Sequence, residues 1–169
     1  SDLSILSEDE KENLRQQIQE FGKQGYRVLG VAKCDFKGNN FPEKQQDFKF
    51  KFIGFTVFYD PPKQNIQQVF RKIYDAGIKV KVITGDNADT SNAIAQQAGI
   101  KNNSPAVNGS EITQHSEAEL RALSGETTLF TRMFPEAKLL VVNALKQSGE
   151  VVAMLGDGVN DAPALKAAH

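Results

Sequence analysis

Residues 151–161, Val-Val-Ala-Met-Leu-Gly-Asp-Gly-Val-Asn-Asp, contain the pattern that decides the expected fold. The first five of these residues are apolar, which is typical of a strand buried on both faces of a parallel sheet. The loop over 156–161 then holds two glycines, two carboxylates and an amide, which is more than a turn requires. Asp157-Gly158 alone would also suit a hairpin turn. Because ligands bind beyond the carboxyl ends of parallel strands, we predict a binding loop at 156–161.

Residues 84–87, Thr-Gly-Asp-Asn, form a second loop of the same kind. They follow residues 78–83, Ile-Lys-Val-Lys-Val-Ile, which we predict to be another strand of the sheet. The threonine hydroxyl and the backbone N–H groups of such a loop suit phosphate oxygens. The four residues alone are also a common turn sequence, so the prediction depends on their occurrence together with 156–161.

Four side chains in or near these loops are candidates for binding a metal ion or a phosphate. Asp157 and Asp161, with Asn160 between them, offer the hard oxygen ligands that suit Mg²⁺. Lys138 lies near the start of a helix that Pro135 opens, where a cation opposes the helix macrodipole. A phosphoryl group as its partner would explain this placement, and an exposed surface lysine is the ordinary alternative.

The remaining sequence alternates strand and helix patterns. Residues 1–50 are polar and rich in turn formers, whereas residues 52–169 alternate short apolar runs with amphipathic helices. This alternation predicts an α/β fold with a parallel sheet, and two domains over 1–50 and 51–169. The expected elements are a helix over 7–22 with a capping box at Ser7 and Glu10, strands over 27–33 and 52–58, a helix from Ile66 to Gly77, a helix ending at Gly99, a helix after Ser116, a strand over 127–131 and a helix from Pro135.

The composition restricts the classes of function. A length of 169 residues corresponds to one or two domains, and 40% hydrophobic residues suffice for a buried core. With 20 Lys and Arg against 21 Asp and Glu, the net charge of -1 argues against a nucleic-acid partner. A single cysteine excludes an internal disulfide and fits a reducing compartment. No apolar run approaches the roughly 20 residues that span a bilayer, and the first residues are too polar for a signal peptide.

These loops resemble the motifs of a known family. Thr84-Gly85-Asp86, Lys138 and residues 156–161 resemble the second, third and fourth motifs of the haloacid-dehalogenase-like superfamily. More narrowly, four stretches resemble the phosphorylation domain of P-type cation-transporting ATPases, in the branch of calcium and sodium pumps. These stretches are YDPPK (59–63), TGDN (84–87), LFTRMFPEAK (129–138) and MLGDGVNDAPALK (154–166). In addition, QGYRVLGVAK (24–33) resembles the end of the nucleotide-binding domain of the same family.

The resemblance implies a fold and an activity. It implies a Rossmann-like parallel sheet with helices on both faces over 51–169, and a remnant of the nucleotide-binding domain over 1–50. The whole protein would be an ATP hydrolase that forms an aspartyl-phosphate and transports a cation, such as calcium, across a membrane. Its cofactors would be Mg²⁺ and ATP, and its partners ATP, the cation and the rest of the pump with its membrane helices, without nucleic acid. The chain would lie at the cytosolic face of that membrane and be soluble by itself.

The resemblance also implies a role for each candidate residue. Asp157 would bind Mg²⁺, and Asp161 would support either the metal or Lys138. Thr84 and Gly85 would hold the phosphoryl oxygens in catalysis, and Lys138 would offset their charge. The remaining roles would be a hydrogen bond from Asn160, orientation of the nucleotide or the loop by Asp86, contact of Arg27 with ATP phosphates, and a hinge at Asp60 and Lys63.

The chain lacks the nucleophile of this family. That nucleophile is the Asp of an Asp-Lys-Thr-Gly-Thr sequence, and no Asp here is followed by Lys-Thr. We therefore expect a piece of a pump, open at both ends and inactive alone, whose sheet lacks the nucleophile-bearing strand. Because backbone groups in a buried gap would be unpaired, we predict that residues 151–155 move to pair with 78–83. A strand from 52–58 or from a second chain is the alternative.

Three other classes of protein stay open at this point. A soluble phosphatase of the same superfamily would need its own Asp-x-Asp nucleophile motif, which the sequence lacks. A non-catalytic module would bind Mg²⁺ and phosphate through the loop at 156–161. A purely structural domain would leave the occurrence of 84–87 together with 156–161 unexplained.

Overall fold

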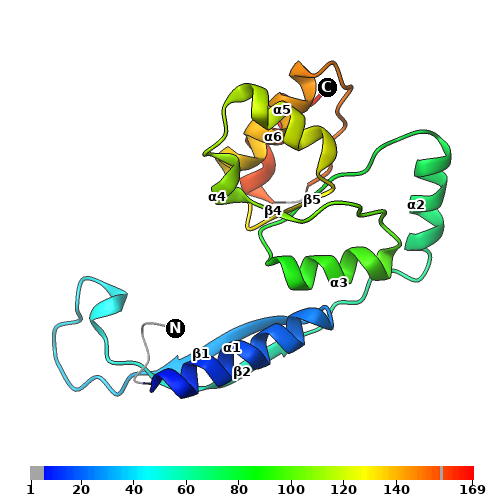
Figure 1. Cartoon of the computed structure of the whole chain (residues 1–169). Helices are drawn as coiled ribbons and strands as arrows, with labels where there is room; N and C mark the ends of the chain where they lie inside the picture. Colours follow the sequence, from blue (N-terminus) through cyan, green and yellow to red (C-terminus); the bar gives the residue numbers. More distant parts are fainter. Residues whose placement is uncertain (1–5, 157) are drawn as a thin grey trace. The chain divides into compact units, whose positions relative to one another are not determined.

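The computed structural model describes residues 6–156 and 158–169, and the chain divides into two compact units. The first unit ends at Asp60, and the second comprises Pro61–His169 (Figure 1). The first contains a two-stranded antiparallel sheet, and the second a three-stranded parallel sheet.

The first unit is a helix packed on an antiparallel ribbon. Helix α1 (Glu8–Lys23) contacts strand β1 (Arg27–Lys33), which pairs along its whole length with strand β2 (Lys51–Phe58). The expected capping box is confirmed, since Ser7 Oγ accepts from the Glu10 N–H and the Glu10 carboxylate accepts from the Ser7 N–H. This box satisfies two backbone donors that the helix itself leaves unpaired.

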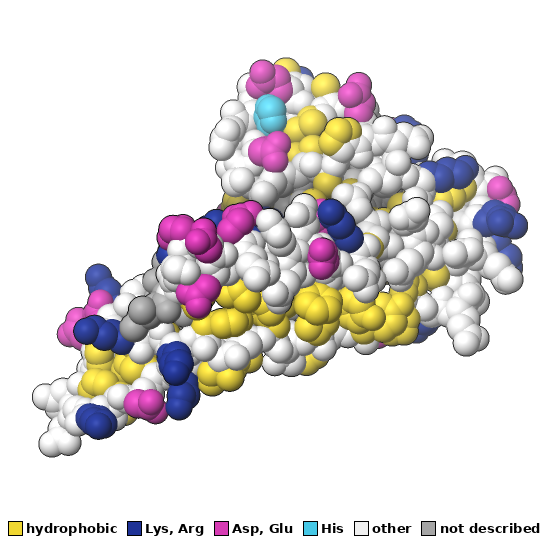
Figure 2. Space-filling model, turned by 60° about the horizontal axis from the view of Figure 1, so that its bottom comes forward, with side chains coloured by type: hydrophobic (Ala, Val, Ile, Leu, Met, Phe, Trp, Pro, Cys, Tyr) yellow, Lys and Arg dark blue, Asp and Glu magenta, His cyan; other side chains and the backbone are white. Residues whose placement is uncertain are grey.

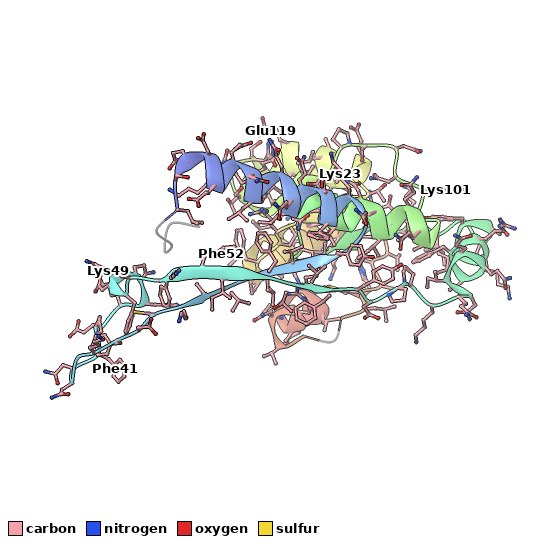
Figure 3. The ribbon with its side chains drawn as sticks, turned by 90° about the horizontal axis from the view of Figure 1, so that it is seen from below. Lys23, Phe41, Lys49, Phe52, Lys101 and Glu119 are labelled. Atoms are coloured by element: carbon pink, nitrogen blue, oxygen red, sulfur yellow. The ribbon has the colours of Figure 1, made fainter. Side chains whose placement is uncertain are left out.

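The ribbon leaves large hydrophobic side chains in solvent. Phe52 lies on the side of the ribbon that faces α1, and Phe41 lies far out in the loop between the strands, which also holds a short 3-10 helix, η1 (Gln45–Asp47) (Figure 3). Leu29 and Ile53 are 51% and 60% exposed, and exposed hydrophobic side chains are visible in Figure 2. No hydrophobic side chain within residues 6–60 is buried, so this unit has no closed core of its own.

The second unit is an α/β domain. Its parallel sheet has the strand order β3-β5-β4, with Val82 opposite Leu129 and Val107 opposite Phe130. Helix α3 lies on one side of this sheet, and α4, α5 and α6 lie on the other (Figure 1). The bounds are α2 (Ile66–Asp75), β3 (Val82–Ile83), α3 (Ala88–Ala98), β4 (Val107–Asn108), α4 (Gly109–Ile112), α5 (Glu117–Glu126), β5 (Leu129–Thr131), α6 (Pro135–Gln147), η2 (Val159–Asp161) and α7 (Ala162–Ala167).

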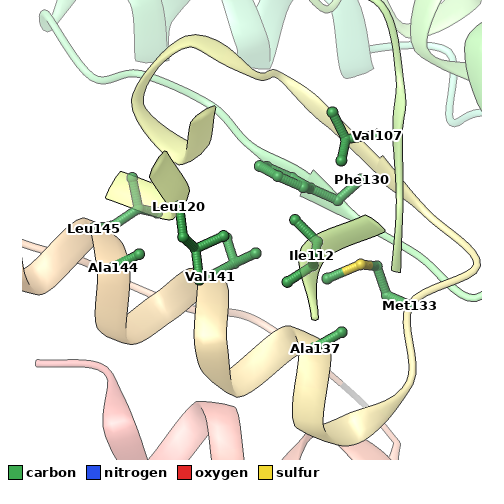
Figure 4. Close-up of a cluster of buried hydrophobic side chains, with 9 residues drawn as sticks. All are labelled: Val107, Ile112, Leu120, Phe130, Met133, Ala137, Val141, Ala144 and Leu145. Atoms are coloured by element: carbon green, nitrogen blue, oxygen red, sulfur yellow. The ribbon is translucent and has the colours of Figure 1, made fainter. Parts of the chain in front are cut away.

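The core of this unit lies between β5 and the helices α4, α5 and α6. Phe130 of β5 is fully buried and packs among side chains of these helices (Figure 4). One side of α6 faces this core, because Ala137, Val141, Ala144 and Leu145 are all buried. The cluster consists of Val107, Ile112, Leu120, Phe130, Met133, Ala137, Val141, Ala144 and Leu145.

Several helix boundaries predicted from local signals are confirmed. Gly99 ends α3 with a left-handed φ of 74°, which glycine adopts without steric cost. The helix expected after Ser116 is α5, which Ser116 opens in a capping box with Glu119, and Pro135 is the first residue of α6. The α/β class and the parallel sheet of the second unit are confirmed as well.

The expected repair of the sheet is wrong. Within 78–83, strand pairing is confined to Val82–Ile83, whose neighbour is β5, and described residues 151–155 form no strand. Residues 52–58 do form a strand, but they pair antiparallel with β1 in the first unit. A strand needs a neighbouring strand for its backbone hydrogen bonds. Val152 bonds instead with His169, whose N–H donates to the Val152 carbonyl over 2.9 Å and whose Nδ1 accepts from the Val152 N–H over 3.2 Å.

Strand β2 belongs to the first unit. Its pairing with β1 joins residues 51–58 to that unit, which ends at Asp60, whereas the two expected domains meet after residue 50. The expected domains stay a prediction, since the compact units do not define them. Pairing partner, and not apolar composition, decides to which sheet a strand belongs.

Candidate functional site

The first predicted loop follows β3 and is ordered by its own side chains. The Thr84 N–H donates to the Phe130 carbonyl over 2.9 Å, which extends the ladder between β3 and β5 by one residue. The Asp86 N–H then donates to Thr84 Oγ1 over 3.1 Å. Asn87 caps α3, because its side-chain oxygen accepts from the Thr90 N–H over 3.0 Å. These hydrogen bonds hold the loop at the carboxyl end of β3 and the N-terminus of a helix.

The turn that leaves β5 holds the same loop from the side. The Arg132 N–H donates to the Asp86 carbonyl, and the Met133 N–H donates to the Thr84 carbonyl, both over 2.9 Å. Both donors belong to the backbone between β5 and α6. The first loop is therefore joined by hydrogen bonds to the turn that leads into the helix carrying Lys138.

Lys138 lies near the start of α6 and reaches the second predicted loop. Its Nζ donates to Asp161 Oδ1 over 2.5 Å, and the two side chains are only 12% and 13% exposed. The other carboxylate oxygen of Asp161 accepts from the Gly158 N–H over 3.3 Å. The hydrogen bond from Lys138 holds the pKa of Asp161 below its ordinary value, although burial acts in the opposite direction.

The folded chain needs glycine at position 156 but not at position 85. A Cβ at Gly156 would lie 2.8 Å from Asp161 Oδ2, so this glycine makes room for the buried carboxylate. At Gly85 the nearest atom to such a Cβ is the Met133 carbonyl oxygen, at 3.9 Å, and the φ angle is not left-handed. The folded chain itself therefore gives no steric or conformational reason for glycine at position 85.

The other predicted site residues are not brought together in the same way. Asp157 lies outside the described residues. Asn160 is exposed in η2. Arg27 begins β1 of the first unit, and Asp60 and Lys63 lie on either side of the boundary between the units.

The described residues contain no group of three or more His, Cys, Asp or Glu side chains that could hold a metal ion. They also contain no helix long and apolar enough to cross a membrane.

The turn at Arg132–Met133 was not expected to be part of the site. It acts through backbone N–H groups, which every residue except proline carries, so residue type gave no signal. The resemblance of residues 129–138 to a motif drew attention only to Lys138. A positive φ of 49° at Arg132 is visible only in the structure.

Comparison with known proteins defines the class to which this fold and site belong. Residues 6–169 match the model of haloacid dehalogenase-like hydrolases, and the chain belongs to this family. This confirms the resemblance to the superfamily that the loops at 84–87 and 156–161 carried.

Individual relatives narrow the class further. "Cation-transporting ATPase pma1" of Synechocystis sp. is 36% identical over 99% of this chain and 19% of its own length. "Calcium-transporting ATPase 1" of Saccharomyces cerevisiae is 34% identical over 95% of the chain and 17% of its own length. "Calcium-transporting ATPase" of Bacillus subtilis is 33% identical over 98% of the chain and 19% of its own length. The chain thus spans about a fifth of the length of the relatives it matches.

Proposed function

We propose that this chain is part of a P-type cation-transporting ATPase and that residues 61–169 bind the phosphoryl group that the pump transfers. The observation that carries the proposal is the hydrogen-bonded connection from Thr84 through the Arg132–Met133 turn to α6, Lys138 and Asp161. This connection holds the loop with the Thr84 hydroxyl and the mostly buried Lys138 ammonium group in fixed positions, as phosphoryl transfer requires. Relatives named as cation-transporting ATPases support the same assignment.

The first loop and Lys138 bind the phosphoryl oxygens. Thr84 offers a hydroxyl, and Gly85 offers a backbone N–H without a side chain that would keep a ligand away. The space around Gly85 supports this role, since the chain itself has no need of glycine there. Lys138 offsets the negative charge of the phosphoryl group, and Asp86 orients the loop through the hydrogen bond that its N–H donates to Thr84.

Mg²⁺ is the metal that the donor set fits. Asp157 would hold it, and Asn160 would add a polar contact nearby. Both oxygens of Asp161 are engaged, by Lys138 and by the Gly158 N–H, which favours support of Lys138 over direct metal ligation. When bound, Mg²⁺ neutralises charge on the phosphoryl oxygens.

The first unit is the end of the nucleotide-binding domain. Arg27 contacts phosphates of ATP, for which the planar, permanently charged guanidinium is suited. Asp60 and Lys63 flank the division between the two units, which supports a hinge at this point of the chain. The exposed hydrophobic side chains of the ribbon, such as Leu29 and Ile53, are then covered by the rest of that domain.

The sheet of the second unit is completed by a strand from another part of the pump. Residues 151–155 are apolar, yet Val151 and Leu155 are 86% and 99% exposed, which is unusual for such a run. The sequence contains no Asp followed by Lys-Thr, so the nucleophile lies outside it. The whole pump lies in a membrane with this chain on the cytosolic side, and it transports a cation, with calcium as the first candidate because several relatives carry that name.

Phosphorylation by ATP tests this function. The whole protein containing this chain, in membrane vesicles with Mg²⁺ and labelled ATP, should form an acid-stable, base-labile phosphoenzyme, and Lys138→Ala should lose most of it. This chain alone should form none. A base-labile phosphoenzyme on the isolated chain, or none on the whole protein, would contradict the proposal.

A further inference from the structure

Gly109, the first residue of α4, lies against the backbone of the turn that leaves β5. A Cβ built on Gly109 would lie 2.6 Å from the Arg132 carbonyl oxygen and 3.1 Å from the Met133 Cα. Backbone atoms cannot swing aside as the end of a long side chain can. The φ of Gly109 is not left-handed, so it is lack of space, and not conformation, that requires glycine here.

Gly109 is fixed in place by its neighbours. The preceding residue, Asn108, pairs with Thr131 in the ladder between β4 and β5, and its side chain caps α4. Ile112, at the end of the same short helix, is fully buried in the core. A side chain at position 109 would therefore displace the turn at residues 132–133 and not α4.

That turn adopts a conformation that needs support. Arg132 has a φ of 49°, a left-handed value that is unfavourable for residues with a Cβ. Such a conformation persists only where the surrounding structure holds it. Here it directs two consecutive N–H groups, of Arg132 and Met133, at the carbonyls of Asp86 and Thr84.

We infer that Gly109 is a positioning residue for the loop Thr84–Asp86, and that it acts through the backbone of Arg132 and Met133. The inference extends the proposed function, because it assumes that this loop binds the phosphoryl oxygens. Gly109 touches no part of that group. By letting the turn approach α4 closely, it fixes the two hydrogen bonds that place the Thr84 hydroxyl and the Gly85 N–H.

Gly109→Ala tests the geometry in this chain, independently of function. Hydrogen exchange measured by NMR should become at least about tenfold faster at the amides of Arg132 and Met133, while Val141 in α6 keeps its protection. Gly125→Ala is the matched control, because it also adds one methyl group to a helical glycine but meets no atom within 4 Å. Unchanged exchange at Arg132 and Met133 in Gly109→Ala would overturn the inference.

The whole protein tests the consequence for phosphoryl binding. Orthovanadate imitates the transferred phosphoryl group, so Gly109→Ala should raise the vanadate concentration for half-inhibition of ATP hydrolysis about tenfold. The KM for ATP should change by less than about twofold, because the nucleotide is held elsewhere. Wild-type protein that vanadate does not inhibit would contradict the proposed function. Inhibitable wild type with an unaltered Gly109→Ala variant would contradict only the role of Gly109.

A second variant decides the case in which Gly109→Ala does not fold. Adding Arg132→Gly allows the turn to move away from the new methyl group without a strained Cβ at position 132. The double variant should regain protection at Val141 while the amides at positions 132 and 133 still exchange fast. A double variant that stays unfolded, or that protects both amides, would overturn the inference.

Discussion

Lys138 and Asp161 form a mostly buried ion pair, and removing one partner should lower the free energy of unfolding. Lys138→Met keeps the apolar stem and removes the cation, so the Asp161 carboxylate stays mostly buried without its 2.5 Å hydrogen bond. We expect a loss of about 1–3 kcal/mol in the free energy of unfolding at pH 7, measured with urea. The pKa of Asp161, which Lys138 lowers, should rise in an NMR titration.

The dependence of stability on pH follows from the sign of this pKa change. Because the pKa of Asp161 is lower in the folded than in the unfolded chain, its stabilising effect is present above the unfolded pKa and is lost as pH falls through the folded pKa. Lys138→Met should therefore lose less stability between neutral and acidic pH than wild type does. Lys11→Met is the matched control, because its partner Glu8 is exposed and exposed pairs contribute little to stability. Equal losses in both variants at pH 7 would contradict the prediction.

Gly85 provides a second prediction at the scale of one residue. Gly85→Ala should leave the stability of the folded chain within about 0.5 kcal/mol of wild type or raise it slightly, because its Cβ has space and its φ is ordinary. In the whole protein the same methyl group should hinder phosphoryl oxygens at the loop and strongly reduce phosphoenzyme formation. Urea unfolding and labelling with ATP measure the two effects. A variant that is destabilised and fully active would refute the role given to Gly85.

Leu155 and Leu129 allow a prediction at the scale of structural elements. Leu155 is 99% exposed in the segment that precedes the second loop, whereas Leu129 in β5 is fully buried. In this chain Leu155→Ala should change the unfolding free energy by less than about 0.5 kcal/mol, and Leu129→Ala should lower it by about 2–5 kcal/mol. If a further strand covers residues 151–155 in the whole protein, as the proposed function requires, Leu155→Ala should also lower the thermal stability there. Equal stability of wild type and Leu155→Ala in the whole protein would argue against the added strand.

Which elements the sequence could predict depends on whether their cause is local. The capping box at Ser7 and the left-handed stop at Gly99 involve neighbouring residues, and both helix ends were predicted correctly. The run at 151–155 has the composition of a buried strand, but a strand also needs a neighbour that its own sequence does not specify. The short pair Val107–Asn108 was missed because two residues show no periodicity.

In the candidate site, too, the sequence predicted some features, whereas others arise only from tertiary packing. The residue types of the loop at 156–161 made Asp161 a candidate, and the helix start and the family resemblance made Lys138 one. Support of Lys138 is one of the two roles predicted for Asp161, and their hydrogen bond favours it. The hydrogen bonds from the turn at Arg132 and Met133 could not be predicted, because their donors are backbone groups brought close by the fold. The close approach of Gly109 to that turn is equally a product of tertiary packing.

The two units of the molecule differ in how many hydrophobic side chains they bury. Every buried hydrophobic side chain of the described chain lies between Ala95 and Ala164, in the second unit, whereas the first unit offers α1 and a two-stranded ribbon with exposed apolar side chains. A two-stranded ribbon is at best marginally stable without further covering.

Residues 61–169 expressed alone should therefore keep the slow hydrogen exchange of Val141 and Phe130, while the first unit of the intact chain should be cleaved first by a dilute protease. Because loops with exposed backbone are the preferred sites of cleavage, we expect the earliest cuts between β1 and β2, within residues 34–50. Early cleavage within α6, or an unprotected Val141 in the shortened chain, would mean that the first unit contributes to the core of the second.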